Sequence, residues 1–318
     1  MTGSGTSAQI GFKIETTPGT RIVPTRFLEL VSENITVDRQ TIRSQGIRTG
    51  RRTASRMSNG ASLITGQFTV IAAPQGLGML LQAVLGAVST SGAGPYTHVF
   101  TPGSITDDTL TVQVGRPRVL STTVDPTDYL GVSLNGFSMS ASATDTEEIP
   151  VVFDIAGGMG YSTAQTLASA SFPSGYSGFR WLDSSISVGG SDVAVKTWGV
   201  DVKNNLVGNR LRISATTPGT PKQSTEGGLR TATGTLTADY SATTLRDAYF
   251  SGADLAVSLA LASGTTSLTI AGNVRPTGST GVVAGPDNLE QPFAYEFYSS
   301  TSDAAAITVT LVNSDSTP

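Results

Sequence analysis

The sequence predicts a mainly β protein with a short flanking helix and an internal duplication. Three observations support this class: apolar residues alternate along many short segments, 36 of the 318 residues are glycine, and only 14% are charged. Alternation with period two is the pattern of a half-buried strand, and glycine is frequent in the turns that join strands. A chain of this length forms one large β domain or two closely packed halves.

The central prediction is a strand over residues 60–73 that runs directly into a helix over residues 74–86. Ile64, Phe68 and Val70 fall on one face of the strand. Pro74 fits a first helical turn, and Gly86 fits a helix end. An apolar stripe with spacing i, i+3, i+4, i+7 and i+8 predicts a packing helix that buries one face. The stripe consists of Leu77, Leu80, Leu81, Val84 and Leu85.

A similar strand and helix follow in the second half of the chain. Residues 228–245 align with residues 60–77 without a gap, so that Gly234 falls on Gly66 and Leu245 falls on Leu77. We interpret this likeness as the duplication of a strand–loop–strand–helix unit. It predicts two halves, 1–160 and 161–318, packed as one structural unit with a seam at residues 161–175. A chance likeness between two Thr/Gly-rich turns is the alternative.

The remaining segments predict further strands and loops. Alternating apolar residues predict strands within 10–14, 25–38 and 109–114, a hairpin over 130–155 with a polar tip at 144–148, and strands within 179–202, 255–270 and 293–311. Glycine, serine, threonine and proline predict a linker at 87–97, a polar loop at 208–227 and a long loop at 272–292.

Residues 39–59 form the most basic segment and contain no acidic residue. The segment has few apolar residues and no clear period, which predicts a long loop between two strands. Three interpretations stay open: a solvated mobile loop, a loop that docks onto acidic side chains of a neighbouring subunit, and a nucleic-acid patch, which the lack of interleaved aromatic residues disfavours. The arginines are Arg39, Arg43, Arg48, Arg51, Arg52 and Arg56.

Residues suited to catalysis or metal binding are scarce. The chain has no cysteine, and His98 is its only histidine, so neither a metal cluster nor a nucleophile–histidine pair has a strong candidate. Asp145, Glu147 and Glu148 cluster at the predicted hairpin tip, where a solvated cluster is the expectation and a cation site or acid–base pair the alternative. We therefore predict no enzyme, no catalytic or metal residues and no cofactor.

The charge and hydropathy pattern bounds the possible partners. The formal net charge is −4, which disfavours a protein that binds nucleic acid over its whole surface. The first nine residues do not resemble a signal peptide. No run of about 20 apolar residues occurs, so no membrane partner is expected.

The order of several segments resembles the tail tube (major tail) proteins of long non-contractile-tailed bacteriophages, the siphophages. The start of the chain, the strand–helix unit, the central hairpin and the closing strands carry this resemblance over most of the chain. The segments are 8–20, 27–30, 65–66, 76–81, 132–139, 179–206, 233–237, 288–292 and 307–312.

The resemblance implies a β-sandwich or barrel-like fold flanked by a helix, and a structural virion protein. Members assemble into stacked rings, hexameric or pseudo-hexameric when the domain is duplicated, that form a hollow conduit for DNA ejection. It implies as partners further copies of the chain, a tape-measure protein, tail tip and tail terminator proteins, and double-stranded DNA that passes without specific binding. It implies a location in the virion tail, and in the host cytoplasm during assembly.

The basic segment at 39–59 resembles in position the long loop that family members use between rings. We therefore expect its arginines to pair with acidic groups of the adjacent ring. Two other classes remain as alternatives: a different structural virion protein, such as a head decoration protein or receptor-binding adhesin, and a β-rich hydrolase that uses the acidic hairpin tip.

Overall fold

The computed structural model describes residues 4–173, 175–241, 243–278, 281, 283, 285–286, 288–300 and 303–318. Antiparallel strands dominate it, and two short α-helices, α1 (Leu77–Leu85) and α2 (Thr244–Ser251), accompany them. Two short 3₁₀ turns, η1 (Gly5–Ser7) and η2 (Trp181–Asp183), complete the helical elements of the described residues. The predicted mainly β class with a flanking short helix is confirmed.

One antiparallel sheet runs through both halves of the chain. Its strands lie side by side in the order β3, β5, β10, β9, β14, β17, β20. The bounds are β3 (Leu30–Glu33), β5 (Met57–Ile71), β10 (Pro150–Gly157), β9 (Val124–Ser142), β14 (Val195–Lys203), β17 (Thr231–Asp239) and β20 (Glu290–Phe297). The step from β9 to β14 joins the first half to the second, so both halves contribute to one main sheet.

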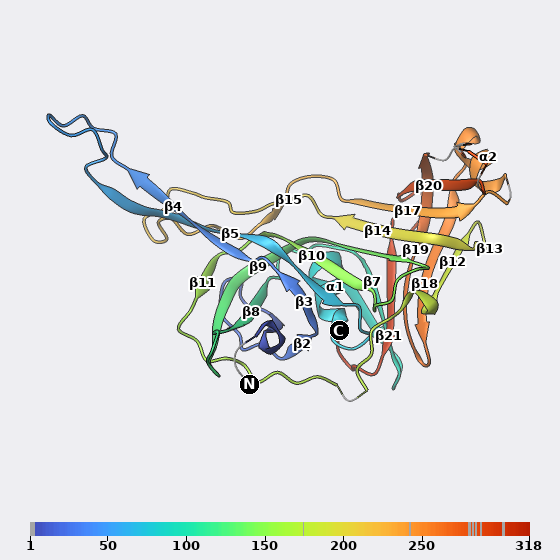
Figure 1. Cartoon of the computed structure of the whole chain (residues 1–318), viewed down its shortest axis with the longest axis horizontal. Helices are drawn as coiled ribbons and strands as arrows, with labels where there is room; N and C mark the ends of the chain where they lie inside the picture. The colour runs from blue at the N-terminus through green and yellow to red at the C-terminus, as the bar shows by residue number, and fades with distance from the viewer. Residues whose placement is uncertain are drawn as a thin grey trace.

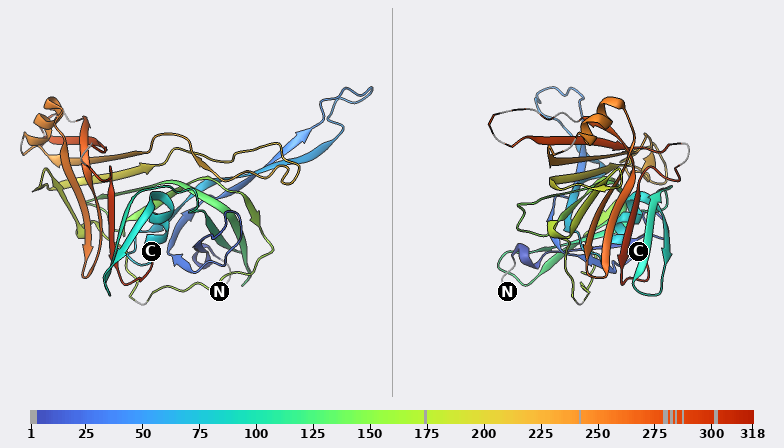
Figure 2. Two further views of the ribbon diagram at one scale, coloured as in Figure 1. Left: turned by 180° about the vertical axis from the view of Figure 1, so that it is seen from behind. Right: turned by 90° about the vertical axis from the view of Figure 1, so that its right-hand side faces the viewer.

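In the first half, the sheet curls around α1 (Figure 2). The first part of β9 pairs with β8 and β11, β8 pairs with β1, and β1 pairs with β2. The bounds are β8 (Leu110–Pro117), β11 (Gly160–Ser162), β1 (Gln9–Ile14) and β2 (Arg26–Leu28). In the enclosed core the ring of Phe68 is tilted against Phe12 and stacked on Phe153, with ring centroids 5.2 and 5.4 Å apart.

In the second half, a further layer of strands stands at a steep angle to the main sheet (Figure 1). Its order is β13, β12, β18, β19, β21, β7, β6. The bounds are β13 (Ser191–Asp192), β12 (Ser184–Val188), β18 (Leu255–Ser263), β19 (Thr266–Gly278), β21 (Thr308–Asn313), β7 (Tyr96–Pro102) and β6 (Gly86–Ser91). Since β6 and β7 come from the first half, this layer also crosses the seam.

Both halves contain the same order of elements around the aligned segments. An antiparallel pair with a long connection is followed by a helix and a hairpin: β4–β5–α1–β6–β7 in the first half and β14–β17–α2–β18–β19 in the second. This shared order agrees with a duplicated unit. The division into two related halves stays a prediction.

Several expected loops contain strands. The predicted linker at 87–97 is wrong, because β6 and β7 form a hairpin there, and β19 extends to Gly278 into the expected loop at 272–292. The expected strand at 25–38 is divided into β2, β3 and the start of β4 (Thr36–Arg43). α1 begins at Leu77, three residues after Pro74. The second partner of β7 is β21, about 200 residues later, which a local pattern does not reveal.

His98 lies on β7 and is fully buried. Its Nε2 lies 3.1 Å from Asn313 Oδ1 and 2.9 Å from the carbonyl oxygen of Asp315, two acceptors that require a proton on Nε2. Nδ1 then accepts a hydrogen bond from Thr90, at 2.8 Å. Asp315 in turn accepts a hydrogen bond from the backbone N–H of Gly76 beside α1. The histidine is thus a structural link between β7, the end of β21 and α1.

Candidate assembly site

A long hairpin projects from the body of the molecule and carries the arginine-rich segment (Figure 1). We call residues 36–65 the arm. β4 pairs with the outer part of β5 from Thr36 opposite Thr65 to Arg43 opposite Met57. The connecting residues 44–56 form the arm tip, which the hydrogen bond from Ser44 N to Arg56 O closes at 2.9 Å. The expected loop at 39–59 is therefore corrected: its ends are strands, and only 44–56 is a loop.

All six predicted arginines lie on the arm with exposed side chains, and among the described residues none of them forms an ion pair. By contrast, arginines on the body such as Arg118 and Arg275 pair with carboxylates. The arm therefore carries exposed positive charge that no described carboxylate of its own chain compensates. The six are Arg39, Arg43, Arg48, Arg51, Arg52 and Arg56.

Apolar side chains on the arm are also exposed. Ile47 at the tip is 102% exposed, and Ile42 and Met57 on the paired strands are more than half exposed. Ile42 pairs with Ser58 and Met57 pairs with Arg43, so the two apolar side chains point to opposite faces of the arm. The combination of arginine and apolar residues suits a protein partner, because arginine is favoured in protein interfaces.

The base of the arm is fixed to the body. Arg116 donates two hydrogen bonds to Glu33 at 2.8 and 2.9 Å, and one to the hydroxyl of Tyr129. Burial opposes the charged form, yet these hydrogen bonds raise the pKa of Arg116 above its usual value. Asn209, from the long connection between β14 and β17, bonds to both backbone groups of Ile64. The arm is therefore directed away from the body by ordered contacts.

The connection between β14 and β17 follows the arm for part of its length (Figure 1). It contains the short paired strands β15 (Leu206–Val207) and β16 (Thr225–Glu226). An isolated antiparallel β-bridge joins the backbones of Arg210 and Lys222. Ile213 on this segment is fully exposed. The polar loop predicted at 208–227 thus lies beside the arm.

The five apolar residues of the predicted packing helix are at most 2% exposed on α1. They face the inside of the first half, where α1 contacts β1, β6, β7 and β9. Leu77, Leu80, Leu81, Val84 and Leu85 are therefore part of the core and do not lie near the arm tip.

The acidic residues of the hairpin tip lie on the turn between β9 and β10. Asp145 and Glu147 are exposed, and Glu148 accepts a hydrogen bond from Gly178 N at 2.9 Å. No described residue forms an ion pair with these three side chains. Among the described residues, no group of three or more His, Asp or Glu side chains could hold a metal ion.

A comparison with families of known proteins identifies the chain. A sequence model of the family described as phage tail tube protein matches residues 5–297. The chain belongs to the phage tail tube protein family. It is therefore a structural component of a phage tail, and the resemblance found in the sequence is confirmed. Among curated proteins, none matches the chain closely enough to count as a relative.

The tail tube protein has two helices among its described residues, and neither is long or apolar enough to cross a membrane. The two features that sequence reasoning did not combine are the exposed apolar residues of the arm and its arginines. Ile42, Ile47 and Met57 are separated by polar residues, so only the hairpin geometry shows that they share one projecting element.

Proposed function

We propose that this protein assembles into rings that stack into the hollow tube of a phage tail, and that DNA passes through the tube during ejection. Membership of the tail tube family supports this role. The single observation that carries it for this chain is the arm, because a projecting element with unpaired arginines and exposed Ile47 needs a partner outside its own subunit.

The arm serves as the contact between stacked rings. It extends beyond the body at one end of the longest axis, so it reaches a neighbouring copy rather than its own core (Figure 1). Its arginines then pair with carboxylates of the adjacent ring. The chain has more acidic than basic side chains, as its net charge of −4 shows, so it has carboxylates to spare for such pairs.

Two units with the same order of elements contribute to one main sheet, which supports a pseudo-hexameric ring of three chains over a hexameric ring of six. Other partners are those of a tail under assembly: a tape-measure protein inside the tube, and tail tip and tail terminator proteins at its ends. The tube wall itself makes no sequence-specific contact with the DNA. Assembly takes place in the host cytoplasm and the product is part of the virion.

Negative-stain electron microscopy of the purified protein over a range of concentrations tests the proposal. Hollow tubes or rings of uniform width are expected, and the rotational symmetry of a ring gives the number of chains in it. The double variant Arg51→Glu with Arg52→Glu should lose tube growth, since two of the four positive charges of the tip are reversed.

The matched control is Arg51→Lys with Arg52→Lys, which keeps the charge and loses only the planar fork. It should assemble more weakly than wild type but better than the glutamate variant. Circular dichroism and size-exclusion chromatography should show folded subunits in all three. Normal tubes from the glutamate variant would overturn the role of the arm.

A further inference from the structure

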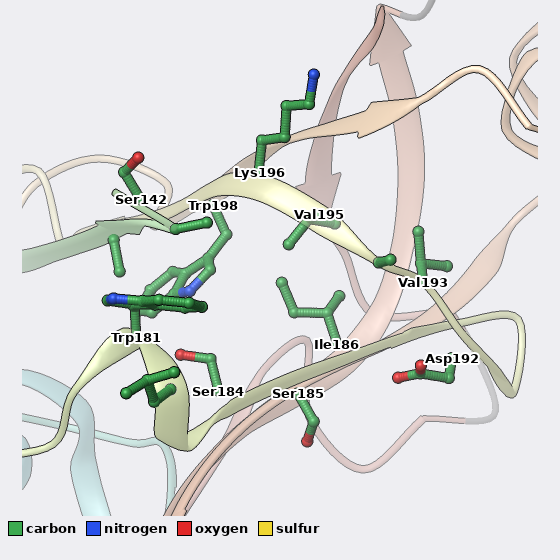
Figure 3. A pocket seen from close by; sticks show the side chains of 14 residues that line it. Ser142, Trp181, Ser184, Ser185, Ile186, Asp192, Val193, Val195, Lys196 and Trp198 are labelled. Carbon is green, nitrogen blue, oxygen red and sulfur yellow. The ribbon is translucent and has the colours of Figure 1, made fainter. Parts of the chain in front are cut away.

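A pocket of about 350 Å³ opens between the start of β14, the β12–β13 hairpin and the end of β9 (Figure 3). Ile186 and Val195 face each other from opposite walls, and Trp181 and Trp198 lie together at one end. Leu182 also lines the pocket and is 65% exposed. We call this the tryptophan pocket.

The tryptophan pocket contains buried polar atoms without partners. Trp198 is only 6% exposed, and no described residue accepts a hydrogen bond from its indole Nε1. The hydroxyl of Ser184, which also lines the pocket, has no partner either. Both atoms lie below the accessible surface, so an occupant of the pocket contacts the apolar side chains of the lining, such as Val195 and Leu182, rather than these two atoms.

The acidic hairpin tip lies at the rim of this pocket. Trp181 Nε1 donates a hydrogen bond to the carbonyl oxygen of Asp145 at 3.0 Å. The nearby basic groups are already paired, Arg180 with Asp183 and Lys196 with Asp239 and Glu290. Asp192, which lines the pocket and forms no ion pair with a described residue, and Asp145 beside Trp181 therefore make the rim negative.

The arm tip has the complementary chemistry. The fully exposed Ile47 is followed by Arg48, Arg51 and Arg52, with no acidic residue among them. The arm tip thus carries an apolar side chain next to positive charges. The body has an apolar pocket next to negative charges, so the two surfaces are complementary.

The two surfaces lie at opposite ends of the molecule. The arm projects at one end of the longest axis, and β12 and β13, which line the pocket, lie toward the other (Figure 1). The arm therefore does not reach the pocket of its own chain. A head-to-tail contact between copies uses two different surfaces, so each copy keeps one surface free for a further copy unless the rotation between copies closes a ring.

We propose that the arm tip of one copy seats Ile47 in the tryptophan pocket of the next copy, with its arginines against Asp145 and Asp192 at the rim. This assignment rests on the proposed self-assembly and names the surface that receives the arm.

Disulfide trapping tests the assignment directly, because the chain contains no cysteine. The double variant Ile47→Cys with Leu182→Cys, oxidised under conditions where wild-type chains form tubes, should give a ladder of linked oligomers on a non-reducing gel. The control is Ile47→Cys with Phe250→Cys, which places the second thiol on an exposed position of α2 away from the pocket. It should remain monomeric on the gel.

Fluorescence provides a second readout, because Trp181 and Trp198 are the only tryptophans. Assembly should shift their emission to shorter wavelength and reduce quenching by acrylamide. Ile47→Asp should lose both changes, since a carboxylate would enter an apolar pocket with an acidic rim.

Separate outcomes distinguish the two levels of the proposal. If wild-type chains form neither rings nor tubes at any concentration, self-assembly fails and the acceptor assignment fails with it. If tubes form but the 47–182 pair links no better than the 47–250 pair, self-assembly stands and the assignment is wrong. A fluorescence shift that persists in Ile47→Asp would show that another segment covers the pocket, which also overturns it.

Discussion

The helices α1 and α2 hold the same place in two strand–helix units but have opposite surroundings. Every residue of α1 except Gln82 is buried, whereas α2 buries only Leu245 and Ala248, and its Phe250 is 70% exposed. Strands of the first half surround α1, while α2 lies at a corner and contacts β19. The shared strand-to-helix pattern therefore determines the local structure, and the neighbouring strands determine how much of each helix is buried.

The aligned glycines Gly66 and Gly234 show the same contrast. Gly66 has a φ of +132°, and a Cβ there would lie 2.6 Å from the carbonyl oxygen of Asn34. A Cβ on Gly234 would lie 2.2 Å from the ring of Tyr295. One position thus requires glycine because of the backbone, and the other because of a side chain.

Truncation of the two helices should give the largest difference. Leu80→Ala leaves a cavity in the α1 core and should lower the free energy of unfolding by about 2–5 kcal/mol. Phe250→Ala, on the exposed face of α2, should change it by less than about 0.5 kcal/mol. Urea unfolding of both variants measures this. Similar losses from the two substitutions would contradict the contrast in burial.

High pH should lower the free energy of unfolding through the buried Tyr295 of the second half. Burial raises the pKa of Tyr295 to about 12 from its ordinary value of 10. Because the folded pKa is the higher one, the stabilisation is complete below pH 10 and is lost as the pH rises from 10 to 12. The loss should be on the order of 2–3 kcal/mol.

Tyr295→Phe isolates this effect. Urea unfolding at pH 8 should give similar stabilities for the variant and wild type, since the ring is retained. Near pH 12 the variant should be the more stable of the two. Parallel pH profiles for the two proteins would show that ionisation of Tyr295 does not oppose folding.

A smaller side chain at position 295 should reduce the loss of stability caused by Gly234→Ala but not the loss caused by Gly66→Ala. Gly234→Ala should destabilise the fold by about 1–3 kcal/mol through overpacking against Tyr295. Adding Tyr295→Leu removes the ring atoms at the contact, so the double variant should lose less than the sum of the two single losses. Gly66→Ala with Tyr295→Leu is the matched control and should show additive losses, because the obstacle there is backbone. Equal coupling in both pairs would refute the distinction.

Local patterns were sufficient for much of the fold. Alternation around Phe68 predicts β5, and the spacing from Leu77 to Leu85 predicts α1, because each element buries one face and shows its period. The arm gave no such signal, since both faces of β4 are exposed and neither needs apolar residues. The strands β6 and β7 were missed because their hairpin is completed by β21, far away in the sequence.

The candidate site was predictable only in part. The arginines are visible as a run without acidic residues, so their docking role could be proposed from the sequence. The tryptophan pocket could not, because Trp181 and Trp198 are brought together only when the Gly189–Gly190 turn folds β12 back toward β14. The acidic tip at Glu147 was noted, but its neighbour Trp181 comes from another element.

The link between His98 and Asn313 has a consequence for synthesis in the cell. The two residues are 215 positions apart, and at 5–20 residues per second a ribosome needs about 10–40 s to make the intervening chain. During that time β7 has β6 but lacks its second partner strand, β21, and α1 lacks the contact of Asp315 with Gly76. The arm hairpin is therefore synthesised well before the core is closed, and only chains translated past Asp315 can complete the contacts around α1.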